Sequence, residues 1–145
     1  MPELSTIPVI TAGGCASNLR TAANAIPVLN EIRHALQRLA EKGESTTIDL
    51  SAIPFGPGDK DQLFEILGTG EVSASVTPCQ MGISEISETR FPGVWRVRHL
   101  GPTDEELAVH IHITRVPDLL LTPQEDIQDS AAALGNEISN IEESS

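Results

Sequence analysis

The sequence predicts an α+β domain, with a mostly antiparallel sheet of about four to five strands and helices packed on one face. Three observations lead to this class. Some segments repeat apolar residues every three or four positions, as amphipathic helices do. Others alternate apolar and polar residues, as half-buried strands do. The predicted strands follow one another through short connections, which favours antiparallel pairing. The predicted element order is α-β-α-β-β-β-β-α.

Two helices are expected in the first half of the chain. The first begins after Asn24, which can cap it, carries Pro27 in its first turn and ends at Gly43. Its apolar face consists of residues at three- and four-residue steps: Ile26, Leu29, Ile32, Leu36 and Leu39. A shorter helix is expected over residues 59–67, where two aspartates in the first turn suit the positive end of the helix dipole.

Five segments have the composition of strands, and one of them is irregular. Alternation is cleanest over residues 71–77. In residues 80–90, Ile83 and Ile86 differ in parity, so a bulge or bend is expected there. The last two strands are expected to form a hairpin. The strand segments are residues 46–50, 71–77, 80–90, 94–99 and 107–114.

The last helix has the clearest start, because residues 122–125 (Thr-Pro-Gln-Glu) match a capping box with proline at the first helical position. An apolar stripe follows: Ile127, Ala131, Leu134, Ile138 and Ile141. We expect this stripe to pack on the domain while the acidic residues of the helix face water. The domain is expected over residues 24–139, between a flexible N-terminal arm (residues 1–23) and a loose acidic tail (residues 140–145).

The chain of 145 residues is strongly acidic, with a formal charge of −12 and no Lys or Arg after Arg115. Such a field repels phosphate groups, so nucleic-acid binding is not expected. No apolar run approaches the ~20 residues of a membrane span, and no secretory signal is visible. The two cysteines, Cys15 and Cys79, form neither a CxxC motif nor a zinc spacing. A cytoplasmic protein with free thiols is therefore expected, with a disulfide as the alternative.

The polar face of the sheet is the first candidate for a site. If the apolar parity of each strand faces the helices, Arg and His residues gather on the opposite face and reverse the sign of the local charge. Such a patch can select an acidic partner, although an ordinary solvated face is the competing interpretation. The residues of this face are Glu71, Ser73, Ser75, Thr77, Arg96, Arg98, His110, His112 and Thr114. The partner-binding candidates among them are Arg96, Arg98, His110, His112 and Glu71.

His110 and His112 are also weak candidates for a metal site, because alternate strand residues point to one face, about 7 Å apart. A third ligand is lacking, since His99 shares the parity of Trp95 and Val97 and is expected on the apolar face. An exposed polar stripe is therefore favoured, and no cofactor is expected. The sequence has no GxSxG motif and no cysteine beside a histidine, so an enzyme is not expected.

Several motifs occur together in one order. They cover residues 25–36, 47–59, 67–74 and 117–127, and the most distinctive of them is Glu88-Thr89-Arg90-Phe91-Pro92-Gly93-Val94-Trp95. Over about residues 25–135, this set resembles the HupH/HyaF family of hydrogenase expression/formation proteins. Six positions in these motifs are expected to have structural rather than catalytic roles: Gly68, Gly70, Glu88, Pro92, Gly93 and Trp95.

The resemblance implies an accessory chaperone in nickel–iron hydrogenase maturation that binds the iron–sulfur small subunit precursor before assembly. Such proteins often work alongside a thioredoxin-fold maturation chaperone. Longer members carry two related modules and this chain has one, so a homodimer through the stripe of the last helix is a further hypothesis. The alternative function is metal or cluster handling by His110 and His112, with Cys79 as a possible third ligand.

Overall fold

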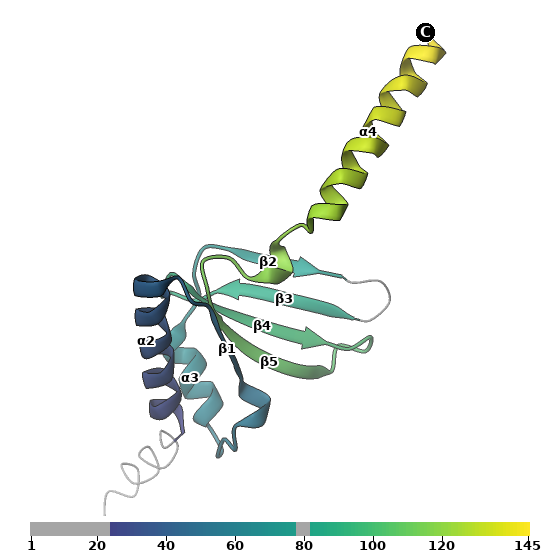
Figure 1. The fold of residues 1–145 in the computed structure, drawn as a ribbon. Helices are drawn as coiled ribbons and strands as arrows, with labels where there is room; N and C mark the ends of the chain where they lie inside the picture. Colours follow the sequence, from purple (N-terminus) through teal and green to yellow (C-terminus); the bar gives the residue numbers. More distant parts are fainter. Residues whose placement is uncertain (1–23, 78–81) are drawn as a thin grey trace, which may run out of the picture. The chain divides into compact units, whose positions relative to one another are not determined.

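The computed structural model describes residues 24–77 and 82–145, in two compact units, Met1–Arg115 and Val116–Ser145. The expected N-terminal arm, Cys15 and Cys79 lie outside the described residues. The predicted class and element order are confirmed (Figure 1). The elements of the first unit are α2 (Ala25–Lys42), β1 (Thr46–Asp49), α3 (Asp59–Leu67), β2 (Ser73–Val76), β3 (Ile83–Glu88), β4 (Val94–Leu100) and β5 (Glu106–Ile113). The second unit contains α4 (Gln124–Ser144).

The five strands form one sheet in the order β1-β5-β4-β3-β2, and all neighbouring pairs are antiparallel. The expected irregularity in residues 80–90 is not found in the described part of that segment, because β3 pairs with β4 without a shift. Ile83 and Ile86 differ in parity because they lie on opposite faces, beside Leu100 and Val97 respectively. The register shift lies instead between His99 and Leu100, where β4 leads into the hairpin.

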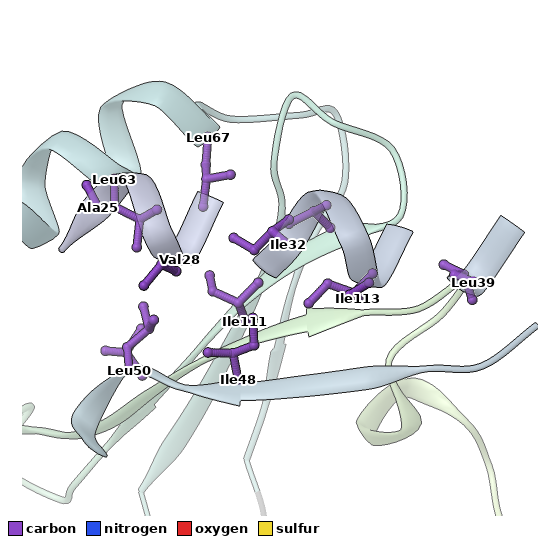
Figure 2. Close-up of a cluster of buried hydrophobic side chains, with 13 residues drawn as sticks. Ala25, Val28, Ile32, Leu39, Ile48, Leu50, Leu63, Leu67, Ile111 and Ile113 are labelled. Carbon is purple, nitrogen blue, oxygen red and sulfur yellow. The ribbon is translucent and has the colours of Figure 1, made fainter. Parts of the chain in front are cut away.

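Helices α2 and α3 lie on one face of the sheet and enclose the core (Figure 1). Figure 2 shows Val28 and Ile32 of α2 directed toward Ile48 and Ile111 of the sheet. The buried line of α2 is Ala25, Val28, Ile32, Ala35 and Leu39. The face expected from the sequence differs from this line by about one position, because it did not include Ala25 and Ala35. Ile26 is consequently 56% exposed, while Leu29 and Leu36 are partly buried at the edge of the core.

The start of α2 also differs from the expected cap. The side chain of Asn24 makes no capping hydrogen bond to the helix. Its Nδ2 donates instead to the carbonyl of Pro54 (2.9 Å) and to Oδ2 of Asp59 (3.2 Å). Asn24 therefore ties the beginning of α2 to the loop before α3. The end of α2 is as predicted, with Gly43 in the left-handed region at φ 72°.

Helix α4 extends beyond its expected end. Residues 140–144, expected to be a loose tail, are helical, and Ser144 Oγ donates to the carbonyl of Asn140 (2.9 Å). No proline or glycine follows Gly135 to interrupt the helix. The capping-box hydrogen bond does not form, since the residue before the first turn is Pro123. No residue of α4 is buried, and packing of its stripe on the domain stays a prediction. Among the described helices, none is long and apolar enough to cross a bilayer.

Candidate functional site

The hydrogen-bond register divides the partner-binding candidates between the two faces of the sheet. Arg96 lies opposite Ile111 and Arg98 opposite Val109, so both arginines are on the face that α2 and α3 cover. Trp95 lies opposite His112 and Val97 opposite His110, so both histidines are on the other face. The single polar face expected from the sequence is therefore wrong. It assigned Trp95 and Val97 to the helix side because they are apolar, whereas β4 buries apolar residues on both faces.

On the helix-covered face, Arg98 is held by two carboxylates of neighbouring strands. Its Nη1 donates to Oε1 of Glu85 (2.7 Å) on β3, and its Nε donates to Oε2 of Glu106 (3.2 Å) on β5. The other oxygen of Glu106 lies 3.7 Å from Nζ of Lys60 on α3. The charge of Arg98 is thus neutralised inside the first unit, which reduces what it can offer to an acidic partner.

Arg96 on the same face is engaged by an aromatic ring. Its guanidinium lies 4.5 Å from the centre of the Phe64 ring of α3, a cation–π arrangement. Burial, with the positive charge of Arg98 as the second cause, lowers the pKa of Arg96. Its Nε is buried without a hydrogen-bond partner among the described residues. The long side chain therefore serves packing between α3 and the sheet more than recognition.

We call the opposite face of the sheet the histidine face, because it carries the imidazoles of His99, His110 and His112 in one row. Trp95, Ser84 and Asp49 lie beside them on the same face. The ring centres of His99 and His110 are 5.2 Å apart, and those of His110 and His112 are 6.1 Å apart. His99 was expected to lie away from the other two, and this was wrong because Val97 and His110 are register partners.

Two members of this row, His99 at one end and His110 in the middle, have polar neighbours. Ser84 Oγ and His99 Nδ1 share a hydrogen bond of 2.9 Å. Asp49 Oδ1 on the edge strand lies 3.6 Å from Nε2 of His110. Burial, and then the proximity of His110, lower the pKa of His99. His99 is therefore neutral at neutral pH.

The candidate metal site gains a third imidazole but not a ligand set. Within residues 24–77 and 82–145, no three His, Cys, Asp or Glu side chains are grouped so that they could hold a metal ion. A strand pair spaces its imidazoles over one face, whereas metal binding needs ligands that converge on one point. Cys79, the possible third ligand, lies outside the described residues. His110 and His112 are therefore better placed to contact a surface than to surround an ion.

The most distinctive sequence motif, residues 88–95, is a turn held together by Thr89. This residue is buried; its Oγ1 donates to the carbonyl of Val94 (2.9 Å) and accepts from the amide of Phe91 (3.2 Å). Gly93 has a φ of 96°, and an added Cβ would lie 3.2 Å from Leu36 of α2. Trp95 Nε1 donates to the carbonyl of Thr114 (3.1 Å). Pro92 lies within the same turn, so the motif fixes the entry to β4.

The segment that follows α3, residues 68–71, is joined to the end of β3 by hydrogen bonds. It contains Glu71 and the two candidate glycines, and its partner on β3 is Glu88. The Gly70 amide donates to the backbone carbonyl of Glu88 (2.7 Å), and the Glu71 amide donates to its Oε1 (3.3 Å). A Cβ at Gly70 would lie 2.5 Å from the Thr89 carbonyl, so only glycine fits. Gly68 ends α3 with a φ of 65°. Glu88 therefore holds the backbone of Gly70 and Glu71 in place, and the Glu71 side chain is exposed.

Sequence reasoning missed the role of Asp59, which it assigned to the helix dipole alone. The side chain is fully buried, and its Oδ2 accepts from the Gly56 amide (2.8 Å) and from Asn24 Nδ2 (3.2 Å). Asp59 therefore organises the Pro-Gly loop of the 47–59 motif. An aspartate that follows Gly-Pro-Gly and opens a helix was the available signal. Ser84, Asp49 and the carboxylates that hold Arg98 were missed because only the register reveals them.

Comparisons with known proteins match most of the chain. The family model of the HupH hydrogenase expression protein, C-terminal conserved region, matches residues 22–141. The hydrogenase expression/formation protein HupQ of Azotobacter chroococcum mcd 1 is 38% identical over 113 residues, which are 77% of this chain and 39% of that protein. The hydrogenase expression/formation protein HupH of Rhodobacter capsulatus is 27% identical over 142 residues, which are 91% of this chain and 51% of that protein.

A solved structure is also similar. The hydrogenase expression protein HupH from Thiobacillus denitrificans ATCC 25259 is 39% identical and superposes with a TM-score of 0.77. The match covers 82% of this chain and 98% of that one. The chain thus corresponds to nearly all of the solved chain, whereas it spans 39% to 51% of the length of the two curated relatives described above.

Proposed function

The chain belongs to the HupH hydrogenase expression protein family, and on this premise we propose that it is an accessory maturation factor, a chaperone, for nickel–iron hydrogenase. In this proposal it binds the iron–sulfur small subunit precursor before assembly, in the cytoplasm, and carries out no catalytic step. The observation that carries the proposal is the family match over residues 22–141, which confirms the resemblance seen in the motifs. The relatives are named for hydrogenase expression and formation.

We place the capture surface on the histidine face. The two arginine candidates are engaged by Glu85, Glu106 and Phe64 on the helix-covered face, so the histidines are the better-placed candidates. Half-buried imidazoles beside Trp95 combine apolar area with hydrogen-bond donors and acceptors, and aromatic side chains such as tryptophan are enriched in protein interfaces. A row of three rings along two adjacent strands gives a surface, not a pocket, as binding of a protein requires.

Affinity capture from hydrogenase-expressing cells tests the proposal, with the full chain as bait and mass spectrometry of the bound proteins. The small subunit precursor is the expected catch, and its iron content shows whether its clusters are already present. A His110→Ala, His112→Ala double variant is expected to reduce capture, because its substitutions lie on the proposed surface. Ile26→Ala, on an exposed position of α2, is the matched control. Capture of the large subunit alone, or none, contradicts the proposal.

Two further partners belong to the proposal. The thioredoxin-fold maturation chaperone is expected to join the complex with the small subunit, because the two kinds of factor often occur together in this family. A second copy of this chain, in a homodimer, is the other partner. Light scattering of the purified chain measures its mass directly, and a monomer at working concentration excludes the homodimer.

Metal or cluster handling by His110 and His112 is the second candidate function. Its basis is the number of imidazoles on one face: His99, His110 and His112 lie in one row, with successive ring centres 5.2 and 6.1 Å apart. Elemental analysis of the purified full chain separates the two functions. A chaperone of this kind contains no stoichiometric metal, whereas a metal-handling protein contains nickel, zinc or iron that the double alanine variant loses.

A further inference from the structure

The stripe of α4 is the largest set of exposed apolar side chains on a single described element. Within the second unit, taken by itself, no described residue covers this stripe, and Ile127, Leu134, Ile138 and Ile141 are 50%, 63%, 49% and 69% exposed. With Ala131 they follow steps of four and three residues, which is the a/d repeat of a coiled coil. Within this helix the stripe runs from Ile127 to Ile141, so it presents a seam of about two heptads, roughly 22 Å long.

The charges along α4 have one sign. Every Lys and Arg of the chain precedes residue 116, whereas seven of the 21 acidic residues follow it. Two glutamates, Glu137 and Glu142, occupy the positions that flank the seam, g and e of the repeat. Glu125 and Glu143 lie on the outer side of the helix, away from the seam. The seam is therefore apolar, with an acidic border along its C-terminal half.

The border disfavours a second copy of this chain as the partner. In a parallel pair, the g position of one helix meets the following e position of the other, which would bring Glu137 against Glu142. An antiparallel pair sets g against g and e against e. The register that stacks Leu134 on Ile138 brings Glu137 against Glu137, whereas a shift by one heptad sets Glu137 against Ser130. Like charges at these positions are destabilising and select against self-pairing. Lys or Arg at the same positions would pair favourably with both glutamates.

We propose that α4 is a docking helix for an amphipathic helix of a partner protein, whose apolar seam is flanked by Lys or Arg. The charge of the border determines this choice. The inference goes beyond the proposed function, because it does not depend on which hydrogenase component is bound. Gly135 occupies an e position beside the seam, and because it has no Cβ a second helix can approach closely there.

Two synthetic helical peptides test the proposal against the full chain. Both carry Ile and Leu at a and d; one has Lys at every e and g position, and the other has Glu. Fluorescence anisotropy is expected to show binding of the Lys peptide about tenfold or more tighter than of the Glu peptide. An L134D/I138D variant is expected to lose binding of the Lys peptide while the fluorescence of Trp95 in the first unit is unchanged.

A charge exchange sharpens the test. The E137K/E142K variant is expected to reverse the preference, so that the Glu peptide binds more tightly. The control E125K/E143K makes the same change of net charge on the outer side of the helix and is expected to keep the preference for the Lys peptide. Equal binding of both peptides, or the same response in both variants, overturns the proposal, because long-range charge alone would then explain it.

Three other results also overturn the proposal. One is the absence of binding of the Lys peptide to the full chain. The second is a homodimer in light scattering that L134D/I138D converts to a monomer, since a second copy would then cover the seam. The third is a lower melting temperature of the monomeric L134D/I138D variant, because the first unit of the same chain would then cover it.

Discussion

The two faces of the sheet in the first unit are built differently. Apolar side chains of α2 and α3 cover the helix-covered face. Its charged residues on β3, β4 and β5 are paired with one another, Arg98 with both Glu85 and Glu106. The histidine face also buries two apolar side chains, Ile86 and Val97. Beside them it carries the row of three imidazoles. The helix-covered face therefore carries the larger apolar core, whereas the histidine face presents half-buried imidazoles beside its own buried apolar side chains.

The largest expected effect lies on the helix-covered face. Ile111→Ala removes a fully buried side chain from the centre of the core, and we expect it to lower the free energy of unfolding by about 2–5 kcal/mol. Its neighbour in the same strand is the matched control: His112→Ala on the other face is expected to cost far less. Urea unfolding followed by circular dichroism measures both. Equal losses would mean that the two faces contribute alike.

Trp95→Phe probes the histidine face at its most buried aromatic position. The change removes the hydrogen bond from Nε1 to the carbonyl of Thr114 and some apolar contact, so we expect a loss of about 1–2 kcal/mol. Since Trp95 is the only tryptophan, circular dichroism must report the unfolding. Phe64→Leu is the counterpart on the other face, where it removes the ring beneath Arg96. A negligible loss from Trp95→Phe would show that this face contributes little to folding.

These two faces also mark the limit of prediction from sequence. The element order was predictable because helix and strand periods differ, and the resemblance was carried by turn motifs such as residues 88–95. Which side of β4 faces the helices was not predictable, because both parities carry apolar residues: Val94 and Leu100 on one, Trp95 and Val97 on the other. Only the pairing of Arg96 with Ile111 decides between them. Arginines occupy the core parity because Phe64 and two glutamates receive them, contacts between segments far apart in the chain.

A smaller effect is expected from the ion pairs of Arg98. Arg98→Gln breaks the contacts with Glu85 and Glu106, but its side chain is 32% exposed, so we expect a loss of at most about 1 kcal/mol. The loss should shrink in high salt, because screening weakens partly exposed pairs. Arg33→Gln on an exposed part of α2 is a control with the same change of charge. A salt-independent loss would assign Arg98 a packing role instead.

The smallest expected effect is on the pH dependence of stability. Since burial and His110 lower the pKa of His99 in the folded state, the unfolded chain takes up a proton at a higher pH than the folded chain does. Protonation of the unfolded state therefore reduces stability as the pH falls below about 6.5, and the loss stops below the folded-state pKa. Above that range both states are neutral at His99, so the residue contributes no pH dependence there.

A His99→Gln variant isolates this contribution, because glutamine keeps a polar side chain near Ser84 and cannot take up a proton. The other histidines and the carboxylates titrate in both proteins, so the difference between the two unfolding curves reports His99. We expect the wild-type chain to lose more stability than the variant between about pH 7 and pH 5. Parallel profiles would indicate that His99 titrates in the folded state as it does in the unfolded chain. The histidine face would then be an ordinary solvated surface, and the contrast between the two faces would reduce to packing alone.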